Sequence, residues 1–314
     1  MNKFLKYLFG FGLFFSLLIA LMTFLFLKAH QLRLKPFPAP NLTNSYSMND
    51  KLDFARGKKA EIIAIGSSMS LNNLDSKVIT EELKNDSYLN LSSWGMSMSD
   101  IYFTLKAYAE LQLPKTVIIS SNIGDFTVMN KALDQDLLGS FLRSSNAVYP
   151  FYFLHHFNLK YYTSNLAYLK KIKQDSTSYE FLRYDPYGAV LYHPQHLKIS
   201  QARWNAAVGQ DPEPQQYEYL EKIADWCKEK KINLLFFQSP VRQGMYSDAQ
   251  HPVDSLKIKK HVVKIAQIMQ QRGHSMADAS RILWSDSLFA DNLHFFDFGA
   301  AQYTRYCFQQ AKKP

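Results

Sequence analysis

Short, fully apolar runs separated by helix-patterned segments are the feature that most constrains the fold of this chain. Five runs recur from residue 60 onward, the last of them weak: 62–65, 88–91, 117–119, 232–237 and 275–277. Helical patterns occupy about 74–83, 99–111, 215–230, 253–271 and 298 onward. Strands buried on both faces read as continuous apolar runs, and intervening helices are the usual crossovers of a parallel sheet. The pattern therefore predicts a doubly wound α/β domain.

The N-terminus carries a second strong signal. Tyr7–Leu27 is an uncharged run rich in leucine and phenylalanine. At about 1.5 Å per residue it can span the roughly 30 Å hydrocarbon core of a bilayer. Lys3 and Lys6 precede it and favour a cytoplasmic N-terminus. Because no small-x-small cleavage site follows, we predict an uncleaved signal anchor with the body outside the cytoplasm, in the periplasm or at the cell surface. A cleaved signal peptide is the alternative.

The remaining chain divides by composition. Residues 29–59 are expected to be a linker, because 35–40 alternates proline with other residues and 41–50 is mostly polar. The predicted parts are the anchor 1–28, the linker 29–59, a first domain part 60–126, an insertion 127–214 and a second domain part 215–314. The insertion is crowded with tyrosine and phenylalanine and is too long and apolar for a simple loop. We expect a mainly helical subdomain, or lid, with a hairpin near Asp185–Gly188.

Charge and cysteine content exclude several classes of protein. The net charge of +9 is spread out, with no long basic run, so nucleic-acid binding is not expected. An anionic membrane or an acidic polymer is the better match for a basic chain. Cys227 and Cys307 lie in predicted helices, where either a disulfide or two buried thiols would fit. No Cys/His cluster has metal-ligand spacing, so no metal site is expected.

Polar residues follow the predicted strands at the points where the strands end. They are Gly66-Ser67-Ser68, Ser92-Ser93-Trp94-Gly95, Ser120-Ser121-Asn122 and Gln238 to Arg242, together with Asp291-Asn292-Leu293-His294 before the last helix. The carboxyl ends of parallel strands meet at one edge of a sheet, where ligands bind. These segments are therefore expected to form one site.

This set of residue types meets the needs of acyl transfer. Ser68, at a strand-to-helix turn, is the predicted nucleophile. His294 is the predicted general base, and Asp291 is placed to fix its tautomer. The oxyanion would be stabilised by the amides of Ser68 and Gly95 and by the side-chain amide of Asn122.

The order Gly-x-Ser, Gly, Asn, Asp-x-x-His resembles that of the SGNH (GDSL-like) hydrolase superfamily, over about 60–125 and 230–312. The resemblance implies a flavodoxin-like sheet and ester or acyl-transfer chemistry without a cofactor. This sequence departs from the family pattern at two places. Ser67 replaces the usual aspartate before the nucleophile, and the third block has Ser120 and Ile123 instead of glycine and aspartate. Asp125 lies nearby at a spacing that the family pattern does not have.

Other residues have weaker functional interpretations. Arg242 is a candidate for binding an anionic substrate group, with a structural ion pair as the alternative. Trp94 is a possible substrate contact or a core residue. The aromatic side chains of the insertion favour packing over sugar stacking.

The anchor and the insertion narrow the function by architecture. A single N-terminal span before an SGNH-like domain resembles the DltD-like and alginate-acetylation-like envelope acyltransferases, which work beside polytopic membrane O-acyltransferases. We therefore expect an extracytoplasmic serine O-acyltransferase or esterase acting on a cell-envelope polysaccharide or a related acyl ester. The alternatives are a non-catalytic scaffold that partners a membrane O-acyltransferase, and a simple anchored lipase or thioesterase.

Overall fold

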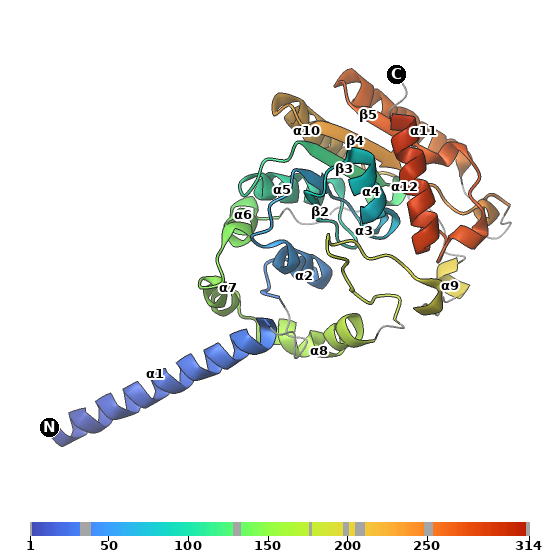
Figure 1. The fold of residues 1–314 in the computed structure, drawn as a ribbon. Helices are drawn as coiled ribbons and strands as arrows, with labels where there is room; N and C mark the ends of the chain where they lie inside the picture. The colour runs from blue at the N-terminus through green and yellow to red at the C-terminus, as the bar shows by residue number, and fades with distance from the viewer. Residues whose placement is uncertain are drawn as a thin grey trace.

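The computed structural model describes residues 2–31, 39–127, 133–175, 178–196, 201–204, 211–247 and 254–311. Five parallel strands form one sheet in the order β2-β1-β3-β4-β5 (Figure 1). The strands are β1 Ile62–Ala64, β2 Tyr88–Asn90, β3 Thr116–Ser121, β4 Asn233–Gln238 and β5 Ser275–Asp278. This is the flavodoxin-like order of doubly wound sheets. The predicted α/β fold is confirmed.

Helices cover both faces of the sheet. One face packs against α5 Met98–Ala109, α10 Pro214–Glu229 and α11 Ser255–Gln271. The other face packs against α3 Ser68–Asn73, α4 Ser76–Leu83 and α12 Asp297–Ala311. Each face of the sheet thus has its own apolar core, a first core under α5, α10 and α11 and a second core under α3, α4 and α12. Successive side chains of β1 alternate between them, since Ile63 belongs to the first core and Ile62 and Ala64 belong to the second. All three side chains are buried, which explains why the strand reads as a continuous apolar run.

The predicted linker is wrong for part of its length. Tyr46–Ala55 forms helix α2, which begins at the N-cap Ser45, whose side chain accepts from the Met48 N–H. Met48, Leu52 and Ala55 are buried in the first core. Their spacing of four and three residues places them on one side of a helix, and this pattern was hidden by the polar residues around it. Residues 32–38 of the linker lie outside the described part.

The segment between β3 and β4 contains α6 Gln135–Arg143, α7 Tyr149–His155, α8 Leu159–Gln174 and the short α9 Gln201–Trp204. The hairpin expected near Asp185 is absent from the described residues. A tight turn is present instead, in which Asp185 Oδ1 accepts from three successive backbone N–H groups. The flanking backbone bonds to distant segments, because Val190 N–H donates to Leu71 O and Asn90 N–H donates to Tyr187 O.

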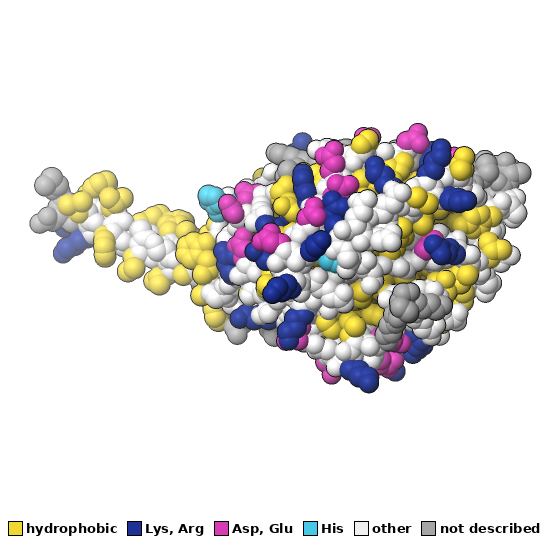
Figure 2. Space-filling model, turned by 90° about the horizontal axis from the view of Figure 1, so that it is seen from above, with side chains coloured by type: hydrophobic (Ala, Val, Ile, Leu, Met, Phe, Trp, Pro, Cys, Tyr) yellow, Lys and Arg dark blue, Asp and Glu magenta, His cyan; other side chains and the backbone are white. Residues whose placement is uncertain are grey.

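Short 3-10 helices complete the described structure: η1 Ile123–Phe126, η2 Pro194–His196, η3 Gln243–Tyr246, η4 Ala279–Arg281 and η5 Asp286–Leu288. The cysteines Cys227 and Cys307 are both buried free thiols. Basic and acidic side chains lie intermixed on the face seen in Figure 2.

Helix α1, Asn2–Gln31, projects away from the domain (Figure 1). Its side chains from Lys3 to Leu25 are exposed, except for the partly buried Thr23. Its stretch Lys3–Leu25 has a mean hydropathy of 2.4 and is long enough to cross a bilayer. Burying such a surface in lipid removes a large apolar area from water. A membrane anchor and a signal sequence both fit this helix.

Candidate active site

Asp291 and His294 form a hydrogen-bonded pair in the loop before α12. The Asp291 Oδ1 atom accepts from the backbone N–H groups of Leu293, at 2.8 Å, and His294, at 2.7 Å. This turn carries the imidazole back toward the same carboxylate, so that His294 Nδ1 lies 2.8 Å from Asp291 Oδ2. The Asp-x-x-His spacing thus fits a single turn that is capped by its own aspartate.

The environment keeps this carboxylate ionised. Burial acts to raise the pKa of Asp291, but the adjacent His294 and the hydrogen bonds donated to the carboxylate outweigh it and hold the pKa at about 2. An ionised carboxylate accepts from the imidazole, which places the ring proton on Nδ1 and leaves Nε2 as an acceptor. His294 Nε2 is buried and has no hydrogen-bond partner among the described residues. A basic lone pair is therefore available.

Ser68 is the first residue of α3 and is half-buried. The preceding Ser67 is the N-cap, and its hydroxyl accepts from the Met69 N–H at 3.1 Å. The Ser67 hydroxyl is thus used to cap α3. Ser68 lies at the N-terminus of the same helix, where the backbone amide groups favour negative charge. No hydrogen bond joins the Ser68 hydroxyl to His294 Nε2 in this structure.

Asn73 ties the helix of Ser68 to the loop of His294. Its Nδ2 donates to the Leu293 carbonyl at 3.0 Å, and its Oδ1 accepts from the Phe295 N–H at 2.9 Å. These contacts lie on either side of His294 in the chain, and Asn73 itself is fully buried. The amide therefore sets the position of the imidazole relative to α3.

Asn122 and Gly95 lie on neighbouring loops. Asn122 follows β3, and its Nδ2 donates to Met69 Sδ at 3.1 Å, which places the amide beside the residue that follows Ser68. Its Oδ1 accepts from the Gly124 N–H at 2.8 Å and so caps η1. Gly95 has a φ of +72°, a backbone conformation that favours glycine. Its loop is joined to the segment that leads into Ser68, since the Ser93 N–H donates to Gly66 O at 3.1 Å.

Asp125 also belongs to this region, although its spacing in the sequence did not predict it as a site residue. Its Oδ2 accepts from the Ser121 hydroxyl at 2.8 Å and from the Asn122 N–H at 3.1 Å. Desolvation raises the pKa of Asp125 to about 6, and Ser67 and His294 are among the groups that oppose this rise. A carboxylate thus interacts with the hydroxyl of Ser67, the residue before Ser68.

Tyr179, in the insertion, also belongs to this site, although the sequence did not predict it as a site residue. Its hydroxyl donates to Asp291 Oδ2, and its oxygen lies 2.7 Å from His294 Nδ1. The Tyr179 ring packs 4.8 Å from the ring of Tyr192, which meets His294 edge-on at 5.9 Å. Nothing in a run of tyrosines distinguishes the one that reaches a carboxylate 112 residues away.

Arg242 and Trp94 have structural partners. The Arg242 Nη1 atom pairs with Asp286 Oδ2 at 2.7 Å, and its guanidinium also donates to the Trp204 carbonyl. Arg242 thus makes the structural ion pair that was the alternative to substrate binding, because a buried guanidinium needs such partners. The Trp94 Nε1–H donates to Asn72 Oδ1 at 3.1 Å, and the ring packs against a small apolar cluster.

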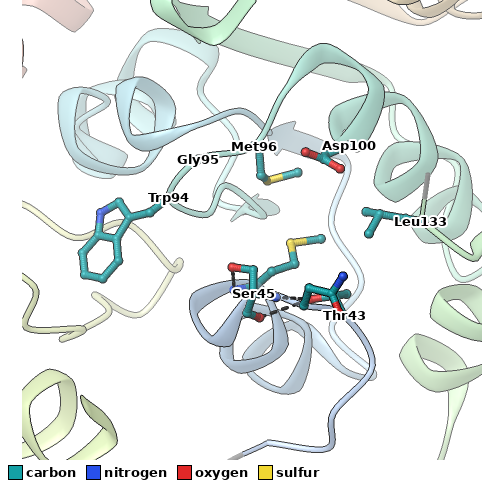
Figure 3. Close-up of a pocket in the computed structure, with 9 residues that line it drawn as sticks. Thr43, Ser45, Trp94, Gly95, Met96, Asp100 and Leu133 are labelled. Atoms are coloured by element: carbon teal, nitrogen blue, oxygen red, sulfur yellow. Dashed lines mark hydrogen bonds between the residues drawn. The ribbon is translucent and has the colours of Figure 1, made fainter. Parts of the chain in front are cut away.

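A pocket of about 240 Å³ lies between the N-terminus of α2 and the loop before α5 (Figure 3). Trp94 and Gly95 are part of its lining, whereas Ser68 and His294 are not. The other lining residues are Thr43, Asn44, Ser45, Met48, Met96, Asp100 and Leu133. Within the described ranges, no group of three or more His, Cys, Asp or Glu side chains is arranged to hold a metal ion.

No family model and no curated protein matches this chain. Its structure is similar to that of a lipase/acylhydrolase from Enterococcus faecalis at 11% identity, with 81% of this chain and 100% of that chain covered and a TM-score of 0.41. An acetylxylan esterase from Geobacillus stearothermophilus gives 11% identity, coverage of 82% and 97%, and a TM-score of 0.39. A GDSL-like lipase from Bacteroides thetaiotaomicron gives 9% identity, coverage of 81% of this chain and 87% of that chain, and a TM-score of 0.41. Because these identities and scores are low, the function of this chain has to come from its own site.

Proposed function

We propose that this chain is a membrane-anchored serine esterase or O-acyltransferase of the SGNH type, acting on a cell-envelope polysaccharide or a related acyl ester. One observation carries the proposal. The Asp291–His294 pair presents an unpartnered Nε2, and Asn73 holds that pair against the helix that begins at Ser68. A serine at a helix start, an imidazole and an ionised carboxylate are the groups that covalent acyl transfer requires.

In the proposed reaction the Ser68 hydroxyl attacks the acyl carbonyl, and His294 Nε2 takes the hydroxyl proton. The Asp291 carboxylate stabilises the imidazolium that forms. The amides of Ser68 and Gly95 and the Asn122 side chain would donate to the oxyanion. His294 then returns the proton to the leaving oxygen, which leaves an acyl group on Ser68. Water or a sugar hydroxyl, activated by His294 in turn, accepts that acyl group and regenerates the serine.

This reaction requires two adjustments of the structure. The Ser68 hydroxyl has to come within about 2.6–3.2 Å of Nε2, and catalytic contacts of this kind often tighten only when substrate binds. The Asn122 Nδ2 donor, which contacts Met69 Sδ, has to turn toward the oxyanion. Sulfur is a weak acceptor, so exchanging that contact for an oxyanion is favourable.

The proposed location follows from α1. With Lys3 and Lys6 on the cytoplasmic side, the apolar helix would cross the bilayer and hold the domain outside the cytoplasm. An esterase or transferase tethered in this way acts on acyl groups at the membrane surface. A polytopic membrane O-acyltransferase would be a suitable partner because it could supply the acyl group to Ser68.

A serine-directed fluorophosphonate probe tests the proposal on the full chain in detergent. We expect the probe to modify Ser68, with the adduct mapped by mass spectrometry and abolished in Ser68→Ala. Ser67→Ala is the matched control, since it removes the neighbouring hydroxyl and costs about 1 kcal/mol of capping but leaves the nucleophile in place. Loss of labelling in Ser67→Ala alone, or equal labelling of wild type and Ser68→Ala, would contradict the assignment.

A non-catalytic scaffold is the second candidate. It is favoured by the missing Ser68–His294 hydrogen bond and by the engagement of Asn122 with Met69. A scaffold would bind its membrane partner equally well with Ser68→Ala and would not react with the probe. Co-purification of the partner with wild type and Ser68→Ala, read together with labelling, separates the two candidates.

A further inference from the structure

The Asp291 carboxylate has four hydrogen-bond partners, and one of them comes from the insertion. Oδ1 accepts from the backbone N–H groups of Leu293 and His294, and Oδ2 accepts from the imidazole and from the Tyr179 hydroxyl. Two carboxylate oxygens offer about four lone-pair sites, so Tyr179 fills the last of them. The same hydroxyl oxygen lies 2.7 Å from His294 Nδ1. One side chain therefore contacts both members of the pair.

The chemistry of the phenol determines what this contact does. Burial raises the pKa of Tyr179 well above its usual value, so the hydroxyl keeps its proton and donates it to the carboxylate. The His294 Nδ1–H then faces two oxygens, Asp291 Oδ2 at 2.8 Å and the Tyr179 oxygen at 2.7 Å. Both contacts favour the tautomer protonated at Nδ1, which leaves the lone pair on Nε2.

The insertion holds Tyr179 in this position. The Arg203 guanidinium lies 3.9 Å above the Tyr179 ring and 3.6 Å from Glu180, and Tyr192 packs against the same ring. The Tyr192 carbonyl accepts from the Asp297 N–H at 2.8 Å, at the start of α12. The segment that carries Tyr179 is thus fastened to the same loop that carries His294.

We propose that Tyr179 is a positioning residue: its hydroxyl fixes the orientation and tautomer of His294 and occupies the last acceptor site of Asp291, so that the insertion completes the catalytic pair. This inference rests on the proposed function in one respect, the role of His294 as the base. The hydroxyl donates one hydrogen bond without adding a competing charge. Water would be a poorer substitute, because it is free to reorient at the carboxylate.

The test is Tyr179→Phe in the full-length chain, which keeps the ring packing and removes only the hydroxyl. Tyr162→Phe is the matched control, because the Tyr162 hydroxyl is buried without a hydrogen-bond partner in the described part of the chain and its ring packs between Phe153 and Phe157 in the same insertion. Two readouts are needed. One is the rate of fluorophosphonate labelling at Ser68, and the other is the NMR signal of the His294 Nδ1 proton in protein with isotope-labelled histidine.

Tyr179→Phe is expected to slow labelling roughly tenfold, the loss of about one charge-assisted hydrogen bond. The Nδ1 proton signal should move and exchange faster with water, while KM for a soluble ester stays unchanged. Tyr162→Phe should match wild type in both readouts. An unchanged signal and an unchanged labelling rate in Tyr179→Phe would overturn the inference. If wild type does not react with the probe at all, the proposed function fails, but the proton signal still decides whether Tyr179 positions His294.

Discussion

Asn73→Ala is expected to loosen the contact between helix α3, which begins at Ser68, and the loop of His294 while leaving the sheet intact. In the structure the Asn73 amide bridges the Leu293 carbonyl and the Phe295 N–H, one on each side of His294. Alanine removes both bridges and leaves the buried Phe295 N–H and the part-buried Leu293 carbonyl without their partners. The His294 loop is then free to shift relative to α3.

Two magnitudes follow from these contacts. A buried backbone group left without a partner costs about 1–3 kcal/mol, and a part-buried one costs less, so the two together destabilise the domain by about 3 kcal/mol. For a domain of this size that corresponds to a fall in Tm of about 6–12 °C. Catalysis should suffer more than stability, because a misplacement of about 1 Å costs on the order of a hundredfold in rate.

The neighbouring residue offers a matched control. Asn72 is also fully buried, and its side chain bridges the Val190 carbonyl at 2.7 Å and the Trp94 Nε1–H at 3.1 Å, neither of which belongs to the His294 loop. Asn72→Ala should therefore lose a similar amount of stability but keep the Ser68 labelling rate within a few-fold of wild type. Thermal melting and fluorophosphonate labelling below both Tm values provide the comparison. Equal losses of labelling in the two variants would refute the idea that Asn73 acts through His294.

Two further predictions concern titratable groups outside the pair. The folded-state pKa of Asp125 is raised above its ordinary value to about 6, so its contribution to stability is full below about pH 4 and is lost as the pH rises through 6. Asp125→Asn should therefore remove a pH-dependent loss of stability of at most about 3 kcal/mol between pH 4 and 7, seen as a flatter Tm profile; a profile parallel to wild type would contradict this. Burial raises the pKa of both thiols, that of Cys227 to about 12, so neither Cys227 nor Cys307 should react with a maleimide until the chain unfolds. Rapid modification of either thiol in the native protein, measured by intact mass, would show that the core is not packed as described.

The sheet could be predicted from the sequence because its strands are buried on both faces. Ile62, Ile63 and Ala64 are all apolar, so the strand can be recognised from its own sequence without knowing which strands it pairs with. Helix α2 was missed for the opposite reason. Met48, Leu52 and Ala55 are its buried apolar side chains, and the partly buried Phe54 packs against the same core, but the polar and charged residues between them gave the segment the composition of a linker.

The site likewise contains residues that the sequence predicts and residues that it does not. Asp291 and His294 are three residues apart, so a local turn is enough to bring them together, and local spacing is visible in a sequence. Tyr179 reaches them from the insertion through contacts that depend on the whole fold. Arg242 follows a strand as a site residue would, but its partner Asp286 lies in a separate loop that the strand pattern does not describe. Long-range partners of this kind require coordinates.

The most direct test of the account is to isolate the acyl group on the protein. The full-length chain, incubated with an activated acyl donor and quenched in acid, should carry one acyl group on the peptide that contains Ser68. His294→Ala should carry far less after the same time. An unmodified Ser68 in the wild-type chain, or an acyl group found instead on Ser67 or on a lysine, would contradict the assignment of Ser68 and His294 as nucleophile and base.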